Sequence, residues 1–185
     1  MAGRLVAVVG PSGAGKDTLL GAARLALAED PRFVFVRRAI TRPAETHRHA
    51  GAEAHLPLSE ADFAKAREAG AFALHWQAHG LHYGIPRSIE SELTEGRVVI
   101  ANLSRGVLAT VPSAYRLCVV LVTAPPAVLA ARIAARGRET PEEIVRRLQR
   151  EALLPDSLEV REVMNDSTPA EGAARLIEML RALAG

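Results

Sequence analysis

One short segment near the N-terminus combines glycines, a lysine and a carboxylate at a spacing suited to phosphate chemistry. Residues 10–20 read GPSGAGKDTLL and fit the pattern G-x-x-x-x-G-K-[ST] as far as the lysine. At the last position Asp17 stands where the pattern has a hydroxyl, and Thr18 follows one place later. Glycines let backbone N–H groups converge on phosphate oxygens, and the lysine reaches the β- and γ-phosphates. The segment therefore predicts binding of a nucleoside triphosphate.

The elements on either side of this segment are those that a phosphate-binding loop requires. Residues 4–9, RLVAVV, form an apolar run typical of a buried strand, and a helical pattern follows the loop. The loop would then lie at a helix N-terminus, where the helix dipole favours an anion. Lys16 is also expected to act in catalysis. The residues expected to contact the nucleotide here are Gly10, Pro11, Ser12, Gly13, Ala14, Gly15, Lys16, Asp17 and Thr18.

Apolar runs and helical patterns alternate along the rest of the chain. Further strands are expected at 33–40, 97–103, 117–123 and 158–164. Helices are expected in SEADFAKAREAG, TPEEIVRRLQRE and TPAEGAARLIEML, which start from Ser59, Thr140 and Thr168 as N-caps. This alternation predicts an α/β fold with a parallel sheet covered by helices on both faces.

The length of 185 residues suits a single domain with a small insertion. The region from about 37 to 92 is polar and contains all six histidines. We expect it to be an inserted acceptor-binding subdomain, with the core formed by 1–36 and 93–185. Phe72 and Trp76 are expected to be core residues of this insertion.

Composition limits the location and the partners of the protein. The only cysteine, Cys118, lies in an apolar run, which predicts a core residue and a reducing compartment. No apolar run approaches the ~18 residues of a membrane-spanning helix, so we expect a cytoplasmic protein. A net charge of +2, without basic–aromatic alternation or an amphipathic basic helix, favours neither nucleic acid nor a membrane surface as partner. The sequence carries no signal for an oligomeric state.

Several motifs follow one another in the order found in guanylate kinases. GPSGAGK near the start of a chain of this size resembles the guanylate kinase type of nucleoside monophosphate kinase. ITRP at 40–43 resembles that family's acceptor-phosphate segment, which implies that Arg42 binds phosphate. GLHYGIP at 80–86 resembles its glycine–tyrosine turn, which implies that Tyr83 donates to the same phosphate. The resemblance implies a P-loop NTPase fold of the guanylate-kinase type.

The C-terminal part of the chain continues this resemblance. Residues 132–151 are similar to the arginine-bearing lid of the family, and we expect the lid at about 134–151. The lid would bring Arg132, Arg136 and Arg147 to the transferring phosphoryl group, and Arg136 precedes the glycine at its tip. MND at 164–166 resembles the segment near the adenine, which implies that Asn165 contacts the nucleotide.

Two departures argue against guanine as the substrate. Guanylate kinases read guanine with a glutamate at a place occupied here by Leu74, in FALHW. They also carry an acidic residue in the strand matched by RVVIANLSRG, where the polar residues here are Asn102 and Ser104. A site that binds a base through paired polar groups loses heavily when those groups are missing.

A second resemblance is closer. The series G-P-S-G-A-G-K-D-[ST], T-R-P and N-x-S-R is similar to ribose 1,5-bisphosphate phosphokinases, which share the guanylate-kinase-like fold. This resemblance implies transfer of the γ-phosphoryl group of ATP to the 1-phosphate of ribose 1,5-bisphosphate, giving 5-phosphoribosyl 1-diphosphate. The product can feed phosphonate breakdown or nucleotide synthesis. The resemblance implies that an aspartate after the loop lysine is typical of this family. The Asp17 carboxylate can hold Mg²⁺ directly or through water. Alternatively, Thr18 holds the metal, and the Asp17 carboxylate only caps the helix N-terminus, where it interacts favourably with the positive end of the helix dipole.

An acceptor with two phosphates would require several cationic or polar contacts. Because Arg105 follows the end of an expected strand, it would lie where α/β proteins bind ligands. His55 is expected in the sugar-phosphate pocket, because GAEAHLPLS occupies the place of a guanylate-kinase segment that touches the acceptor. The expected acceptor-binding set is Arg42, Tyr83, Asn102, Ser104, Arg105 and His55, with Arg48 and Arg87 as weaker additions.

Three other interpretations compete with this kinase. The spacing of the histidines, H-x-H at 47–49 and H-x-x-H at 79–82, does not favour a zinc site, because no CxxC or HExxH pattern accompanies them. A guanylate-type nucleoside monophosphate kinase remains the alternative enzyme. A non-catalytic guanylate-kinase-like binding module is the alternative of another class, and the intact loop lysine and lid arginines argue against it.

Overall fold

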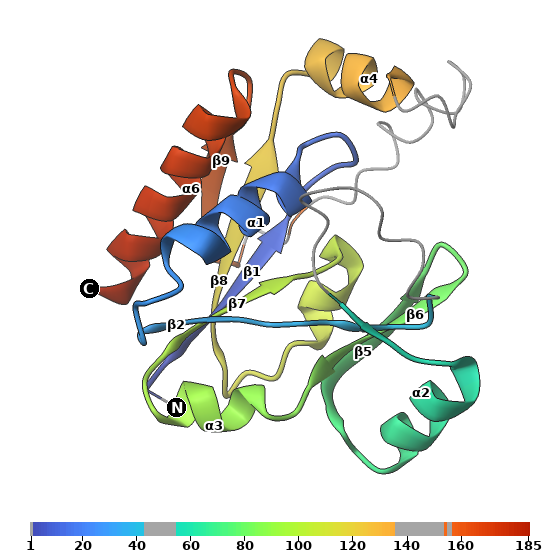
Figure 1. Cartoon of the computed structure of the whole chain (residues 1–185). Helices are drawn as coiled ribbons and strands as arrows, with labels where there is room; N and C mark the ends of the chain where they lie inside the picture. Colours follow the sequence, from blue (N-terminus) through green and yellow to red (C-terminus); the bar gives the residue numbers. More distant parts are fainter. Residues whose placement is uncertain (1, 43–54, 136–153, 155–156) are drawn as a thin grey trace.

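The computed structural model describes residues 2–42, 55–135, 154 and 157–185. A five-stranded sheet runs through the centre of the molecule (Figure 1). Its strand order is β2 (Phe33–Phe35), β7 (Val98–Asn102), β1 (Arg4–Val9), β8 (Arg116–Thr123) and β9 (Val160–Met164), and all neighbouring pairs are parallel. The central strands β1 and β7 are apolar except for Arg4 at the start of β1 and Asn102 at the end of β7, because both of their faces are covered. The predicted parallel sheet is confirmed.

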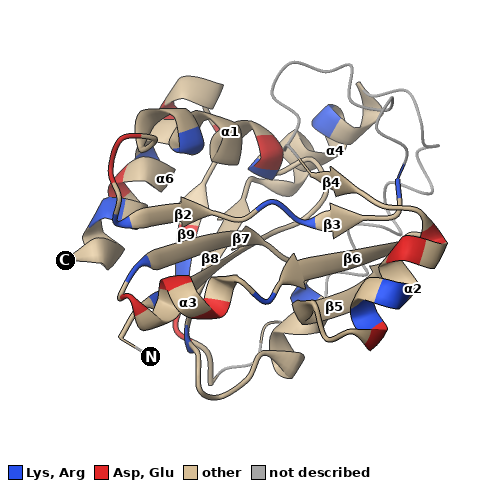
Figure 2. Ribbon diagram, turned by 60° about the horizontal axis from the view of Figure 1, so that its bottom comes forward, with Lys and Arg blue, Asp and Glu red and all other residues tan. Residues whose placement is uncertain are grey.

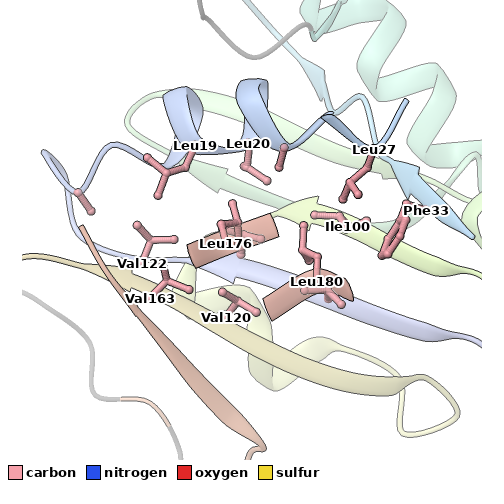
Figure 3. Close-up of a cluster of buried hydrophobic side chains, with 14 of the residues drawn as sticks. Leu19, Leu20, Leu27, Phe33, Ile100, Val120, Val122, Val163, Leu176 and Leu180 are labelled. Atoms are coloured by element: carbon pink, nitrogen blue, oxygen red, sulfur yellow. The ribbon is translucent and has the colours of Figure 1, made fainter. Parts of the chain in front are cut away.

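Helices α1 (Lys16–Ala26) and α6 (Pro169–Ala184) cover one face of this sheet (Figure 1). Figure 3 shows their leucines meeting the sheet valines in one apolar cluster. Helix α6 begins as its sequence predicts, because the Thr168 hydroxyl accepts from the Glu171 amide while the Glu171 carboxylate accepts from the Thr168 amide. Cys118 is fully buried in its strand, and burial raises the pKa of its thiol.

The opposite face is covered by short elements and by part of a second sheet. Helix α3 (Ile89–Thr94) and the 3₁₀ helix η2 (Arg105–Thr110) contribute apolar side chains there, together with Leu74 and Ile85. The Tyr115 hydroxyl donates to Glu90 Oε1 at 2.7 Å and fastens α3 to the segment before β8. Burial, reinforced by this hydrogen bond, raises the pKa of Tyr115 to about 12.

The second sheet has four strands and lies beside the C-terminal end of the first. Its order is β4 (Leu56–Pro57), β3 (Ala39–Ile40), β6 (Leu81–Pro86) and β5 (Phe72–Ala78), and helix α2 (Glu60–Glu68) packs on it. The Ser59 hydroxyl accepts from the Asp62 amide at 3.0 Å, which confirms the predicted start of α2. Strands β5 and β6 form a hairpin whose two turn residues, His79 and Gly80, both have positive φ.

Two sequence predictions about these elements are corrected by the structure. The single strand expected at 33–40 is two strands in different sheets, because pairing with the first sheet stops after Val36 donates to the Ile100 carbonyl. The segment GLHYGIP is not one turn, because only its first residue lies in the hairpin turn and Tyr83 lies within β6.

The remaining described helix, α4 (Pro126–Ala134), follows β8. The helix expected after Thr140 and nearly all of the expected lid at 134–151 lie outside the described residues. No helix in the described part of the chain is long and apolar enough to cross a membrane.

Candidate nucleotide and acceptor site

The phosphate-binding loop spans residues 10–15, between β1 and α1. Gly10 has φ +152°, and a Cβ there would overlap the carbonyl oxygen of Val122 in the neighbouring strand. Gly15 takes the N-cap position of α1 in the left-handed region, with φ +84°. The N-cap residue Gly15 has no side chain that could cap the first turn of α1, and a helix N-terminus of this kind suits an anion. The loop has the backbone shape that phosphate binding requires.

The Lys16 side chain folds across this loop. Its Nζ donates to the carbonyl oxygens of Gly10 at 2.6 Å and Pro11 at 3.0 Å. The ammonium group therefore lies at the mouth of the loop, where a triphosphate would meet it.

Asn165 supports the loop from behind. The residue is 3% exposed, and its Nδ2 donates to the Ala14 carbonyl at 2.7 Å. A Cβ on Gly15 would lie 2.6 Å from the same Nδ2, so the asparagine fits closely against the loop. The Arg132 guanidinium donates to the Asn165 carbonyl at 2.9 Å. Asn165 thus braces the loop and Arg132 braces Asn165. The contact of Asn165 with the nucleotide and that of Arg132 with the transferring phosphoryl group stay predictions.

A cavity of about 480 Å³ opens over the loop and extends to the second sheet. On the loop side it is lined by residues 10–13 and 15–18. The polar residues that line its other side include Arg38, Arg42, His79, Tyr83, Asn102, Ser104 and Arg105. The fold thus gathers into one cavity almost all of the loop and five of the six predicted acceptor residues, which are far apart in the sequence.

The charges that line this cavity are mostly positive. Lys16 faces it from the loop, and Arg38, Arg42 and Arg105 face it from the acceptor side. Asp17 is the one carboxylate among the described lining residues. Figure 2 shows part of this charge as the blue segment between β2 and β3. An excess of fixed cations over carboxylates suits a donor and an acceptor that both carry phosphate.

Asp17 is oriented by a residue from another strand. Its Oδ1 accepts from Asn102 Nδ2 at 3.0 Å, which joins the first turn of α1 to the end of β7. Asp17 and Thr18 are exposed to the cavity and offer hard oxygen donors. This donor set fits Mg²⁺, which prefers oxygen ligands and keeps several of its waters.

Aromatic stacking fixes the acceptor side of the cavity. The rings of Tyr83 and Trp76 lie opposite each other on β6 and β5, with centroids 5.3 Å apart and planes at 9°. Trp76 Nε1 donates to Ser104 Oγ at 2.9 Å. Trp76 is therefore not simply a core residue of the insertion, since it ties the second sheet to the end of β7. Phe72, by contrast, is buried against Phe63 as expected of a core residue.

Several predicted residues do not line the cavity. Ala14 is a buried residue of the loop, and its carbonyl accepts a hydrogen bond from Asn165 Nδ2. His55 is buried, and its carbonyl accepts from Arg37 at 3.3 Å. Arg87 lies outside the cavity lining and donates to the carbonyls of Gly70 and Phe72, so it braces the start of β5. The predicted residues Arg48, Arg136 and Arg147 lie outside the described residues.

Sequence reasoning missed Arg38. It was included in a strand expected to continue to residue 40, whereas the structure places it on the link between the two sheets and against the cavity. The signal was the pair of arginines at 37–38, which interrupts the apolar run FVFV. Among the described residues, no group of three or more His, Cys, Asp or Glu side chains is placed to hold a metal ion.

Curated relatives decide the family of this chain. It is 55% identical over 155 residues to the ribose 1,5-bisphosphate phosphokinase of Brucella melitensis, a match that covers 83% of this chain and 79% of the relative. The corresponding enzyme of Rhodopseudomonas palustris is 48% identical over 181 residues, 97% of this chain and 89% of the relative. The chain belongs to the ribose 1,5-bisphosphate phosphokinase family. No protein-family model matches it.

Solved structures place this family member among the guanylate-kinase-like folds. The guanylate kinase of Anaplasma phagocytophilum superposes with a TM-score of 0.66 over 98% of this chain and 86% of that chain, at 16% sequence identity. At such low identity the likeness establishes the fold alone. The predicted α/β fold of the guanylate-kinase type is therefore confirmed for this chain.

Proposed function

We propose that this chain transfers the γ-phosphoryl group of ATP to the 1-phosphate of ribose 1,5-bisphosphate, releasing ADP and 5-phosphoribosyl 1-diphosphate. An oxygen of the 1-phosphate attacks the γ-phosphorus, a new P–O–P bond forms, and the bond between the γ-phosphorus and the β,γ-bridging oxygen breaks. The observation that carries this proposal is the single cavity in which the phosphate-binding loop faces three arginines. Membership of the phosphokinase family supports the choice of acceptor.

Phosphoryl transfer needs positioning and charge neutralisation more than covalent help from the protein. The loop amides and Lys16 would hold the β- and γ-phosphates of ATP. Arg42 and Tyr83 would hold the accepting phosphate, with Arg105 beside them at the end of β7. The second sheet would serve as the acceptor subdomain, and the lid arginines Arg136 and Arg147 would complete the charge around the transferring group.

The donor side of this proposal includes Mg²⁺. Asp17, oriented by Asn102, would hold the ion directly or through water, and Thr18 would be the alternative ligand. When bound, Mg²⁺ neutralises charge on the β- and γ-phosphate oxygens. The hydrogen bond from Asn102 fixes the Asp17 carboxylate in one orientation before nucleotide arrives.

The direct test of the proposed function is ADP release from ATP with ribose 1,5-bisphosphate as the added acceptor. We expect release that requires the sugar and stops when one equivalent of ADP has formed per acceptor. ADP release that ignores the acceptor would mean that the protein is an ATPase. No release at all, in protein shown to be folded, would favour the non-catalytic binding module.

The role of Asp17 predicts a change in metal requirement. Because Asp17→Asn removes the charge but keeps the size, it should raise the Mg²⁺ concentration needed for half-maximal rate by about tenfold, the effect of losing roughly 1.4 kcal/mol of metal binding. Asp17→Ser should restore part of the wild-type value, because serine is a hydroxyl ligand.

A Mg²⁺ titration of the rate measures this effect, and Thr18→Val is the matched variant. If Asp17→Asn titrates like the wild type while Thr18→Val requires more Mg²⁺, Thr18 holds the metal.

A further inference from the structure

Arg38 occupies a distinct part of the cavity. It lies on the link between β2 and β3, the basic segment that leads from one sheet to the other in Figure 2. Its guanidinium carbon is 5.5 Å from the centroid of the Tyr83 ring. A planar guanidinium against an aromatic ring is attracted by the ring quadrupole and loses much of its rotational freedom. The contact with the Tyr83 ring therefore positions the Arg38 cation before a ligand binds.

The Tyr83 ring beside Arg38 is held by the Trp76 ring, which is itself held by a hydrogen bond. Tyr83 stacks on Trp76 across the β5–β6 hairpin, and Trp76 donates to Ser104 at the end of β7. The series Arg38, Tyr83, Trp76 and Ser104 thus links both sheets along one side of the cavity. Each member restricts the next, so the position of Arg38 is set by the packing of the fold.

The order of the strands places Arg38 away from the transfer point. It follows β2, which is two strands from β1 in the first sheet, whereas Ser104 and Arg105 follow β7, the immediate neighbour of β1. Neighbouring strands are about 4.8 Å apart, so the end of β2 is roughly 10 Å to the side of the loop that follows β1. The accepting phosphate must meet the γ-phosphate close to that loop. A second phosphate of the same sugar would then lie farther out, and Arg38 is the lining arginine that follows the outer strand β2.

We propose that Arg38 binds the 5-phosphate of the acceptor and so selects sugar bisphosphates over acceptors with a single phosphate. This inference rests on the proposed function for its substrate. A guanidinium suits the task because it offers several N–H donors in a plane and can bind phosphate through two of them at once. Arg42, Tyr83 and Arg105 remain for the phosphate that reacts.

The first test compares substrates that differ only in the 5-phosphate. Arg38→Met keeps an apolar stem against Tyr83 and removes the charge. We expect kcat/KM for ribose 1,5-bisphosphate to fall about ten- to one-hundred-fold, the usual worth of a charge-assisted hydrogen bond. For ribose 1-phosphate, which lacks the 5-phosphate, the same variant should lose less than twofold. An equal loss with both sugars would show that Arg38 acts on the reacting phosphate or on the fold, and would overturn the proposal.

The second test measures binding without turnover. Trp76 is the only tryptophan of the chain and belongs to the stack, so its fluorescence reports on this part of the cavity. Titration with ribose 5-phosphate should give a Kd that Arg38→Met raises about tenfold or more. Arg37→Met is the matched control, because Arg37 is the adjacent arginine and lies outside the cavity lining. If Arg37→Met and Arg38→Met give the same Kd, the proposal is wrong.

The two tests also separate this inference from the function on which it rests. Wild-type protein that releases no ADP with ribose 1,5-bisphosphate contradicts the proposed function, while the ribose 5-phosphate titration still decides the role of Arg38. Wild-type protein that turns over the bisphosphate, together with an Arg38→Met variant that behaves like it, contradicts only the role of Arg38. Where ribose 1-phosphate turns over too slowly to follow, the Kd values from the titration decide the role of Arg38.

Discussion

Lys16→Ala should lower kcat by about 10³-fold, the scale on which a fixed charge stabilises phosphoryl transfer. Lys16, the first residue of α1, is the only cation in the segment 10–18 that lines the cavity, and its Nζ lies at the loop mouth, 2.6 Å from the Gly10 carbonyl oxygen. Loss of its two hydrogen bonds to the loop should cost about 1–2 kcal/mol of stability, which leaves the protein folded. The measurement is ADP release at saturating ATP and acceptor, with folding checked by circular dichroism.

The chain offers a matched control for this experiment. Lys65, the only other lysine, lies exposed on α2 and outside the cavity lining. Lys65→Ala should therefore leave kcat within a factor of about two, because exposed substitutions rarely change stability by more than ~0.5 kcal/mol. Near-wild-type turnover in Lys16→Ala would remove the P-loop kinase interpretation altogether.

GMP should be a poorer acceptor than ribose 1,5-bisphosphate by about ten- to ten-thousand-fold in kcat/KM. By the guanylate-kinase resemblance, guanine is read by a carboxylate at the place of Leu74 and by an acidic residue in the strand that is β7 here. Leu74 is 4% exposed and packs in the apolar cluster under the first sheet, so it offers the base no acceptor. Each donor of the base left unpaired costs roughly 1–3 kcal/mol, and two are left.

A comparison of four nucleoside monophosphates strengthens this prediction. Without groups to read a base, the enzyme should use GMP, AMP, CMP and UMP equally poorly, each by way of its phosphate alone. Parallel ADP-release assays at matched millimolar concentrations measure these rates beside that of the sugar bisphosphate. A marked preference for GMP would restore the guanylate-kinase alternative.

Most of the fold could be predicted because its signals are local. The run RLVAVV is apolar without interruption after its first residue, as a strand buried on both faces must be, and it forms β1 over the same six residues. The start of α6 is predicted by three residues within four positions, Thr168, Pro169 and Glu171. The structure contains the capping box that they predict. In each case a few neighbouring residues determine the outcome.

The break within 33–40 could not be predicted, because it depends on a distant partner. Val36 makes the last backbone hydrogen bond to the first sheet, and soon afterwards β3 pairs with β6. The arginines at 37–38 interrupt the apolar run, but the sequence does not show where pairing with the neighbouring strand β7 stops. For the same reason, the position of Arg38 against the cavity could be seen only in the structure.

The sequence predicted most of the residues that line the cavity, and it also included some that lie elsewhere. Arg42, Tyr83 and Asn102 were found through motifs, and the structure brings them to the same cavity as the loop. Arg87 was counted as a weaker acceptor ligand because it is an arginine near the motif, yet its guanidinium is occupied by carbonyls of a turn. Residue type and proximity in the sequence do not reveal which arginines donate their hydrogen bonds to backbone carbonyls of the fold.

The central claim is that the phosphoryl group is transferred onto a phosphate and not onto a sugar hydroxyl. ³¹P nuclear magnetic resonance of the product formed from ATP and ribose 1,5-bisphosphate tests this most directly. A diphosphate at carbon 1 gives two mutually coupled phosphorus signals, and the 5-phosphate remains a single signal without phosphorus–phosphorus coupling. We predict this spectrum, with one ADP formed per diphosphate. A product with three uncoupled phosphate signals, or an unchanged sugar bisphosphate beside released ADP, would contradict the account.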